Sequence, residues 1–132
     1  MSAFSIDVSR AEALVRTADV LLRTLGPGEV ILVLPVGDAS LGLGSATTEE
    51  LPLSPAVIRN IGGATATRPR LEIMLSACTV KAQAESRNFD CPQALFNAAL
   101  GVLYSDKLLR IESVTWDSFA DVPYLYRITV TD

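Results

Sequence analysis

The stretch KLLRIESVTW at residues 107–116, followed by YLYRITVT at residues 124–131, decides the fold. In the second stretch the residues alternate between two sets: Tyr124, Tyr126, Ile128, Val130 and Leu125, Arg127, Thr129, Thr131. This two-residue period is typical of a pleated β-strand. The residues between the two stretches, 117–123, predict a short polar connection. We therefore expect residues 107–131 to form a β-hairpin.

Residues 9–36 predict a helix followed by a buried strand. Ser9 and Glu12 have the spacing of a capping box, so the helix is expected to begin at Ser9. Apolar residues follow at helical spacing: Ala11, Leu14, Val15, Ala18, Leu21, Leu22 and Leu25. Gly26 and Pro27 are typical of a helix end. The unbroken apolar run within 29–36 predicts a strand covered on both faces, one of them by this helix.

The remaining segments favour short strands and helices. Residues 71–75 predict a half-buried strand, residues 76–88 a helix, and residues 102–104 a short strand. A second helix start is expected at Asp90, with Pro92 in the first turn and Gln93 three residues after the cap. The predicted fold class is α+β: a small, mainly antiparallel β-sheet or barrel with an N-terminal helix and one or two central helices. At 132 residues, the range 1–132 fits a single domain.

The segment 37–70 has weak periodicity and many Gly, Pro, Ser and Thr residues, which predicts a long interaction loop. Within it, residues 50–53 suggest a short edge strand and residues 55–60 a single helical turn. Two interpretations stay open: the segment orders on a partner, or it folds over its own core. The candidate interface residues are the apolar residues of this segment and two aromatic residues near the hairpin: Leu41, Leu43, Leu51, Leu53, Val57, Ile58, Ile61, Trp116 and Phe119.

Composition narrows the classes of function. The apolar fraction is 49% and the charged fraction 20%, which predicts a protein–protein interface. The net charge of −4 and the scattered basic residues argue against tight binding of a phosphate backbone. No apolar run reaches the length of a spanning helix, and the N-terminus lacks a signal core, so the protein is expected in the cytoplasm of the cell that makes it.

The residues that usually carry catalysis are sparse. The sequence contains no histidine, which removes the commonest general base and metal ligand. Cys78 and Cys91 lie in apolar stretches and are interpreted as free thiols. Asp117 and Asp121 are interpreted as turn residues. We therefore predict no catalytic residue, no cofactor, no metal site and no enzyme activity.

Several segments resemble one family in their layout. SDKLLRIESV at 105–114 and YLYRITV at 124–130, with RAEALV at 10–15 and EVILVLPV at 29–36, resemble the small head-completion proteins of tailed bacteriophages. These are the stopper or head–tail joining proteins of the neck. The helical stretch 76–100 departs from that mostly β pattern. Tail-terminator proteins, which mix helices with a sheet, are the near alternative.

The resemblance implies a structural role in a virion. Copies would form a homo-oligomeric ring between portal and tail after a period in the host cytoplasm, with genomic DNA passing through the ring without tight binding. The segment 37–70 would reach the lumen or a neighbouring ring, and no membrane partner is implied. The alternative from the residues alone is a cytoplasmic binding or adaptor domain, in which this segment would cover a small apolar pocket.

Overall fold

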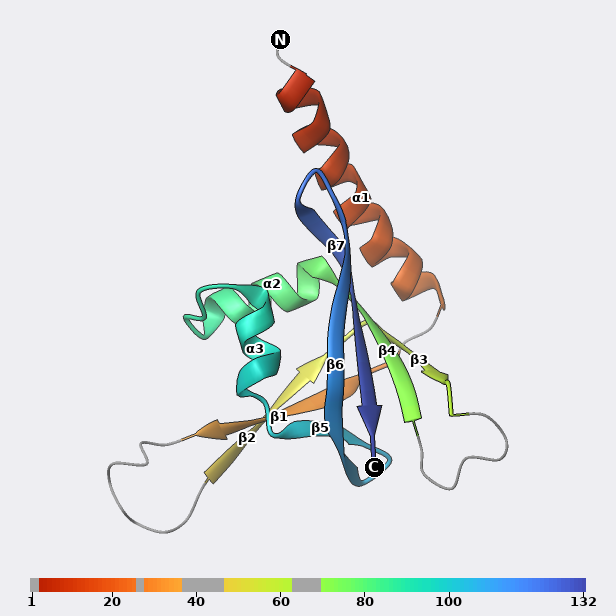
Figure 1. Cartoon of the computed structure of the whole chain (residues 1–132), viewed down its shortest axis with the longest axis vertical. Helices are drawn as coiled ribbons and strands as arrows, with labels where there is room; N and C mark the ends of the chain where they lie inside the picture. Colours follow the sequence, from red (N-terminus) through yellow and green to blue (C-terminus); the bar gives the residue numbers. More distant parts are fainter. Residues whose placement is uncertain (1–2, 26–27, 37–46, 63–69) are drawn as a thin grey trace.

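A computed structural model describes residues 3–25, 28–36, 47–62 and 70–132 of the chain (Figure 1). Its elements are α1 (Ala3–Leu25), β1 (Val30–Val36), β2 (Thr47–Leu53), β3 (Ala56–Asn60), β4 (Arg70–Ser76), α2 (Ala77–Ser86), α3 (Pro92–Ala98), β5 (Gly101–Tyr104), β6 (Lys107–Phe119) and β7 (Val122–Thr131). The expected α+β class, with an N-terminal helix and an antiparallel sheet, is confirmed. The sheet remains open and does not close into a barrel.

The seven described strands form one sheet in the order β2-β1-β5-β6-β7-β4-β3, and each neighbouring pair is antiparallel. The two edge strands, β2 and β3, are consecutive in the chain and are joined only by Ser54 and Pro55. The sheet must therefore curl until its two edges approach. One hydrogen bond joins β3 to the residues just before β1, from the Ala56 amide to the Gly28 carbonyl (2.9 Å). A side chain at position 28 would place its Cβ 2.0 Å from the Ala56 carbonyl oxygen, so this approach requires glycine.

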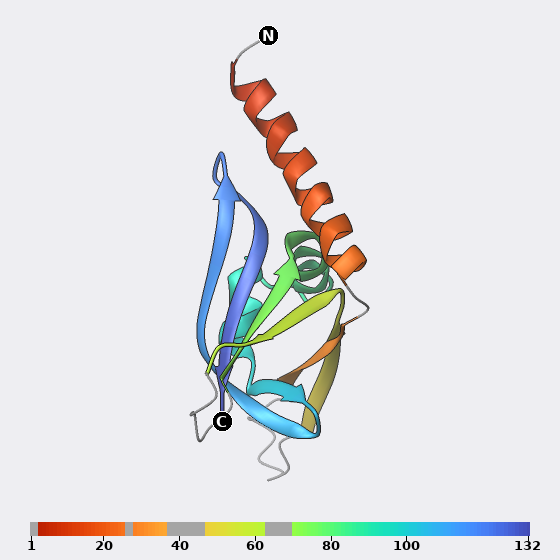
Figure 2. The same cartoon turned by 90° about the vertical axis from the view of Figure 1, so that its right-hand side faces the viewer.

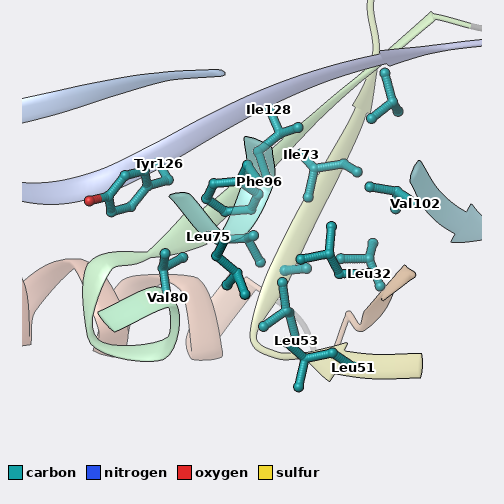
Figure 3. Packing of buried hydrophobic residues seen from close by; sticks show 14 of the residues in the cluster. Leu32, Leu51, Leu53, Ile73, Leu75, Val80, Phe96, Val102, Tyr126 and Ile128 are labelled. Atoms are coloured by element: carbon teal, nitrogen blue, oxygen red, sulfur yellow. The ribbon is translucent and has the colours of Figure 1, made fainter. Parts of the chain in front are cut away.

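The sheet divides at β6, which pairs with both sides. We call β2, β1, β5 and residues 107–109 of β6 the β1 half, and β3, β4, β7 and residues 110–119 of β6 the β7 half. The inner faces of both halves meet in one core, together with Leu95 and Phe96 of α3 (Figure 3). Because both halves and α3 pack on this one core, their outer faces hold fixed positions relative to one another.

The predicted hairpin is confirmed, but its strands are longer and its turn is tighter than expected. β6 and β7 extend to Phe119 and Val122, and Ala120 and Asp121 both have positive φ (50° and 63°). Two such residues form the tight turn that matches the twist of antiparallel strands. Pro123 made the segment resemble a loop. The strand tolerates it because β4 pairs only with residues 125–131 of β7, which leaves residue 123 with a neighbour on one side.

Helix α1 differs from the prediction at its start and in its position. It begins at Ala3, so Ser9 lies inside the helix and the expected cap is wrong. No Gly or Pro occurs between residues 3 and 9 to stop the helical pattern. The helix packs mainly on β7, β4, α2 and β3, so the expectation that it covers one face of the strand at 29–36 is also wrong. In Figures 1 and 2, its N-terminal half extends beyond the sheet beside the tip of the β6–β7 hairpin.

The central helices and short strands follow the sequence pattern closely. Ala77, Val80 and Ala84 are the buried residues of α2, and the buried Ser76 caps its N-terminus. Helix α3 is preceded by Cys91 at its cap, one residue later than the predicted cap Asp90. β4 and β5 match the strands expected at 71–75 and 102–104.

The long loop predicted over 37–70 is wrong for residues 47–62. These residues form the two edge strands, and the helical turn expected at 55–60 is strand β3. The expected edge strand at 50–53 lies within β2. Leu51 and Leu53 are 3% and 1% exposed and belong to the core (Figure 3). The rest of the predicted loop, residues 37–46 and 63–69, lies outside the described residues.

Candidate interaction surfaces

The middle of α1 and the β6–β7 hairpin line a cleft of about 710 Å³. Its remaining walls come from α2 and from the connection between α2 and α3. Trp116 lines it and is 44% exposed. Cys78 and Cys91 also line it as free thiols, as predicted, but both are exposed, so the apolar surroundings expected for them are wrong.

Tyr126 forms part of the cleft wall and connects it to the core. Its ring centre lies 6.0 Å from that of Phe96 and 6.2 Å from that of Trp116, both in tilted arrangements. The hydroxyl points away from the Phe96 ring in Figure 3. Burial raises the pKa of Tyr126 above its ordinary value of 10.0, and the nearby Cys91 raises it further. The hydroxyl is therefore a neutral group at neutral pH, able to donate one hydrogen bond into the cleft.

A polar network attaches α1 to the end of β4. The Ser76 hydroxyl donates to Asp19 Oδ1 (2.8 Å), and Arg23 Nε donates to Asp19 Oδ2 (2.9 Å). Ser76 also accepts a bond from the Thr79 amide, and the Thr79 hydroxyl donates to the Ser54 carbonyl. Burial alone would raise the pKa of Asp19, but the hydrogen bonds and charge supplied by Arg23 and Ser76 lower it below 3.8. Asp19 is therefore ionised at neutral pH and holds the helix in place.

One side of α1 carries no charge between residues 13 and 25. At 100° per residue, the charged residues Glu12, Arg16, Asp19 and Arg23 share one side. The outward side, which we call the uncharged face of α1, consists of Ala13, Leu14, Thr17, Val20, Leu21, Thr24 and Leu25.

The uncharged face of α1 is exposed and offers few polar groups. Leu21 and Leu25 are 57% and 69% exposed. The hydroxyls of Thr17 and Thr24 donate to the carbonyls of Ala13 and Val20, each at 2.8 Å. These bonds turn the hydroxyls back onto the helix, so both threonines have their hydrogen-bonding donors occupied locally. The face therefore behaves as an apolar surface.

The outer face of the β1 half carries an apolar row. Ile31 pairs with Pro52 on one side and with Leu103 on the other, and Leu103 pairs with Leu108. Residues directly opposite in a sheet point to the same face. Their neighbours along the strands, such as Leu32, are buried, so these four residues point outward and form one row across β2, β1, β5 and β6. Leu108 is 51% exposed. We call Pro52, Ile31, Leu103 and Leu108 the outer row.

The outer face of the β7 half has the opposite chemistry. Arg59 of β3 binds Glu72 of β4 (2.8 Å), and Arg127 of β7 lies 3.5 Å from the same carboxylate oxygen. Arg127 also binds Asp117 of β6 at 3.0 Å. These four residues, which we call the ion-pair ladder, cross all four strands of the β7 half. Each charge has an opposite neighbour, so this face is well suited to contact with water.

The candidate interface residues of the sequence are dispersed in the structure. Leu41 and Leu43 lie outside the described residues. Leu51 and Leu53 are in the core, so they are not available as interface residues. The other candidates fall into two groups: half-buried Val57, Ile58 and Ile61, and exposed Trp116 and Phe119.

Sequence reasoning missed the uncharged face of α1 and the outer row. Leu21 and Leu25 belong to the apolar series that the sequence places at helical spacing with Leu22, but the structure leaves them exposed. A helical-wheel count of charges would have shown that the helix has two uncharged sides, and that Leu21 and Leu25 lie on the one that does not face the core. The outer row had no local signal, since its four members come from four strands and only their pairing brings them together.

Comparisons with known proteins return no matching family, no matching curated protein and no matching solved structure. Within the described ranges, no group of three or more His, Cys, Asp or Glu side chains is placed to hold a metal ion. None of the described helices combines the length and apolarity needed to cross a membrane.

Proposed function

We propose that this chain is a structural protein that acts by assembling into a homo-oligomeric ring, in the head–tail neck of a tailed bacteriophage virion. One observation supports the assembly: exposed apolar side chains lie together in two uncharged areas, with Val20, Leu21 and Leu25 on the uncharged face of α1 and Leu108 on the outer row, while another outer face carries paired charges. Contiguous apolar areas on a surface mark contact sites, because covering them removes apolar surface from water. The phage context rests on the sequence resemblance.

The charge of the chain is compatible with this role. A net charge of −4 disfavours tight binding of DNA, so the genome can pass through a ring of such subunits. Within the proposal, α2 and α3 favour the tail-terminator position over the stopper position, because the stretch 76–100 contains two helices. The portal and the tail proteins next to the ring are the proposed partners.

The oligomeric state tests the proposal directly. Native mass spectrometry over a concentration series, with negative-stain images of the same samples, is expected to show one closed ring species. Addition of the neighbouring portal or tail protein is expected to shift the population towards the ring by mass action. A chain that stays monomeric at every concentration and with these partners contradicts the proposal.

A second candidate, a small-molecule binding domain, is favoured by the cleft. Its volume of about 710 Å³ lies within the usual range for ligand sites, and its lining combines the aromatic side chains of Trp116 and Tyr126 with polar and charged ones such as Arg16 and Asp121. Fluorescence of Trp116, the single tryptophan in the chain, reports on this cleft. Saturable quenching of Trp116 by a small aromatic probe, lost in the variant Cys78→Phe, whose exposed side chain lines the cleft, would support this candidate over assembly.

A further inference from the structure

We propose that the uncharged face of α1 in one copy packs on the outer row of the next copy. The proposal rests on the proposed ring and names the two surfaces that build it. The uncharged face is a convex ridge on a helix, and the outer row lies on the face of a sheet. A helix packed on a sheet is one of the common ways to bury an apolar face of each element.

The dimensions of the two surfaces agree. The uncharged face spans residues 13–25, which at 1.5 Å per residue is about 18 Å of helix. The outer row crosses four strands, and three spacings of about 4.8 Å give about 14 Å. The helix can therefore lie along the row and contact all four of its members.

The chemistry of the two surfaces also agrees. Neither surface contains a charged side chain, and the hydroxyls of Thr17 and Thr24 are already bonded to their own helix. Contact between the two surfaces therefore buries no unpaired charge, which would destabilise an interface strongly. The ion-pair ladder is a poor alternative site for the same helix face, because covering it would remove paired charges from water without new partners.

The contact joins two different surfaces, so it is head-to-tail. Each copy uses its helix face towards one neighbour and its outer row towards the other. Such contacts produce closed rings when the rotation between copies closes, and open filaments when it does not. In a ring each copy makes the contact twice, which gives a modest single interface a larger combined effect.

Two single variants test the pairing of the surfaces. Leu21→Glu places a charge on the helix face, and Leu108→Glu places one on the outer row; both side chains are more than half exposed, so the fold is expected to persist. Each variant alone is expected to lose the ring, with association weakened more than about tenfold by the unpaired charge. Ser113→Glu, on the exposed outer face of the β7 half, is the matched control and is expected to keep the ring.

Mixing the two variants is the decisive measurement. The helix face of the Leu108→Glu copy and the outer row of the Leu21→Glu copy are both intact, so the mixture is expected to form a 1:1 heterodimer and nothing larger. Sedimentation velocity with one variant labelled detects this species. Circular dichroism and urea unfolding of each variant confirm that the fold is retained, and Leu108→Ser replaces Leu108→Glu if that variant unfolds.

The outcomes separate the pairing from the proposed function. If the natural chain forms rings and either variant keeps them, the pairing is overturned while the proposed ring stands. If Leu108→Glu forms a dimer alone and Leu21→Glu does not, the helix faces pair with each other and the pairing is likewise overturned. A natural chain that is always monomeric overturns both.

Discussion

The β1 half and the β7 half of the sheet share β6 and one core, yet their outer faces have opposite chemistry. In the β7 half, the ion-pair ladder pairs each charge across neighbouring strands. In the β1 half, the outer row places four apolar side chains at the corresponding outward positions. The inner faces do not show this difference, since both are apolar and buried. Burial of the inner faces therefore does not determine the chemistry of the outer faces, and the two halves differ only in what their outer faces can contact.

The largest expected change in the free energy of unfolding comes from comparing a residue on the inner face of the β1 half with one on its outer face. Leu53→Ala removes a fully buried side chain and is expected to lower the free energy of unfolding by about 2–5 kcal/mol. Leu108→Ala on the outer row is the matched control and is expected to cost less than about 0.5 kcal/mol in the isolated chain. Urea unfolding at a concentration where the chain is monomeric measures both. Equal losses would show that the outer row is part of the folded core.

A smaller effect concerns the attachment of α1, which is bonded to the end of β4 in the β7 half. Asp19→Asn removes the charge from the bonds with Ser76 and Arg23 and is expected to cost about 1 kcal/mol at pH 7. The folded-state pKa of Asp19 is lowered, so its contribution is present above the unfolded value of 3.8 and is lost as pH falls through the folded value.

Urea unfolding across pH checks this attachment. The difference between the natural chain and Asp19→Asn is expected to be constant from pH 7 to pH 5 and to shrink below pH 3.8. Glu12→Gln, a change of the same kind at an exposed position on the same side of α1, serves as the control. A difference that persists unchanged in acid would mean that the Asp19 charge does not hold the helix.

The smallest effect tests the ion-pair ladder itself. Arg127→Met keeps an unbranched apolar side chain but removes the charge that joins Glu72 and Asp117, and it is expected to cost about 0.5 kcal/mol at low salt. At high salt this difference is expected to vanish, because salt screens exposed charges. A cost that is large and independent of salt would show that the ladder stabilises the fold by packing, and would weaken the contrast between the two halves.

Local patterns in the sequence predicted the elements whose burial has a regular period. Tyr126, Ile128 and Val130 alternate with polar neighbours, and Ala77, Val80 and Ala84 recur at helical spacing, so β7 and α2 were predicted, and the structure buries these residues. Strand β2 was predicted only over residues 50–53 and β3 was missed, because Pro52, Pro55 and the neighbouring glycines resemble a loop when their pairing partners are unknown. At Ser9 the sequence predicted a helix start that does not exist, because a capping sequence does not prevent a helix from extending N-terminal to it.

The sequence by itself determined the α+β class, the closing hairpin and the lack of histidine chemistry, because these depend on residue type and on spacing along one segment. Only the tertiary structure decided which residues lie outside. Leu51 and Leu53 became core residues when β2 paired with β1, and Pro52, Ile31, Leu103 and Leu108 became one row through the pairing of four strands. The physical reason is that strand pairing joins residues far apart in the chain, and the periodicity of a single strand shows that it has two faces without showing what each face meets.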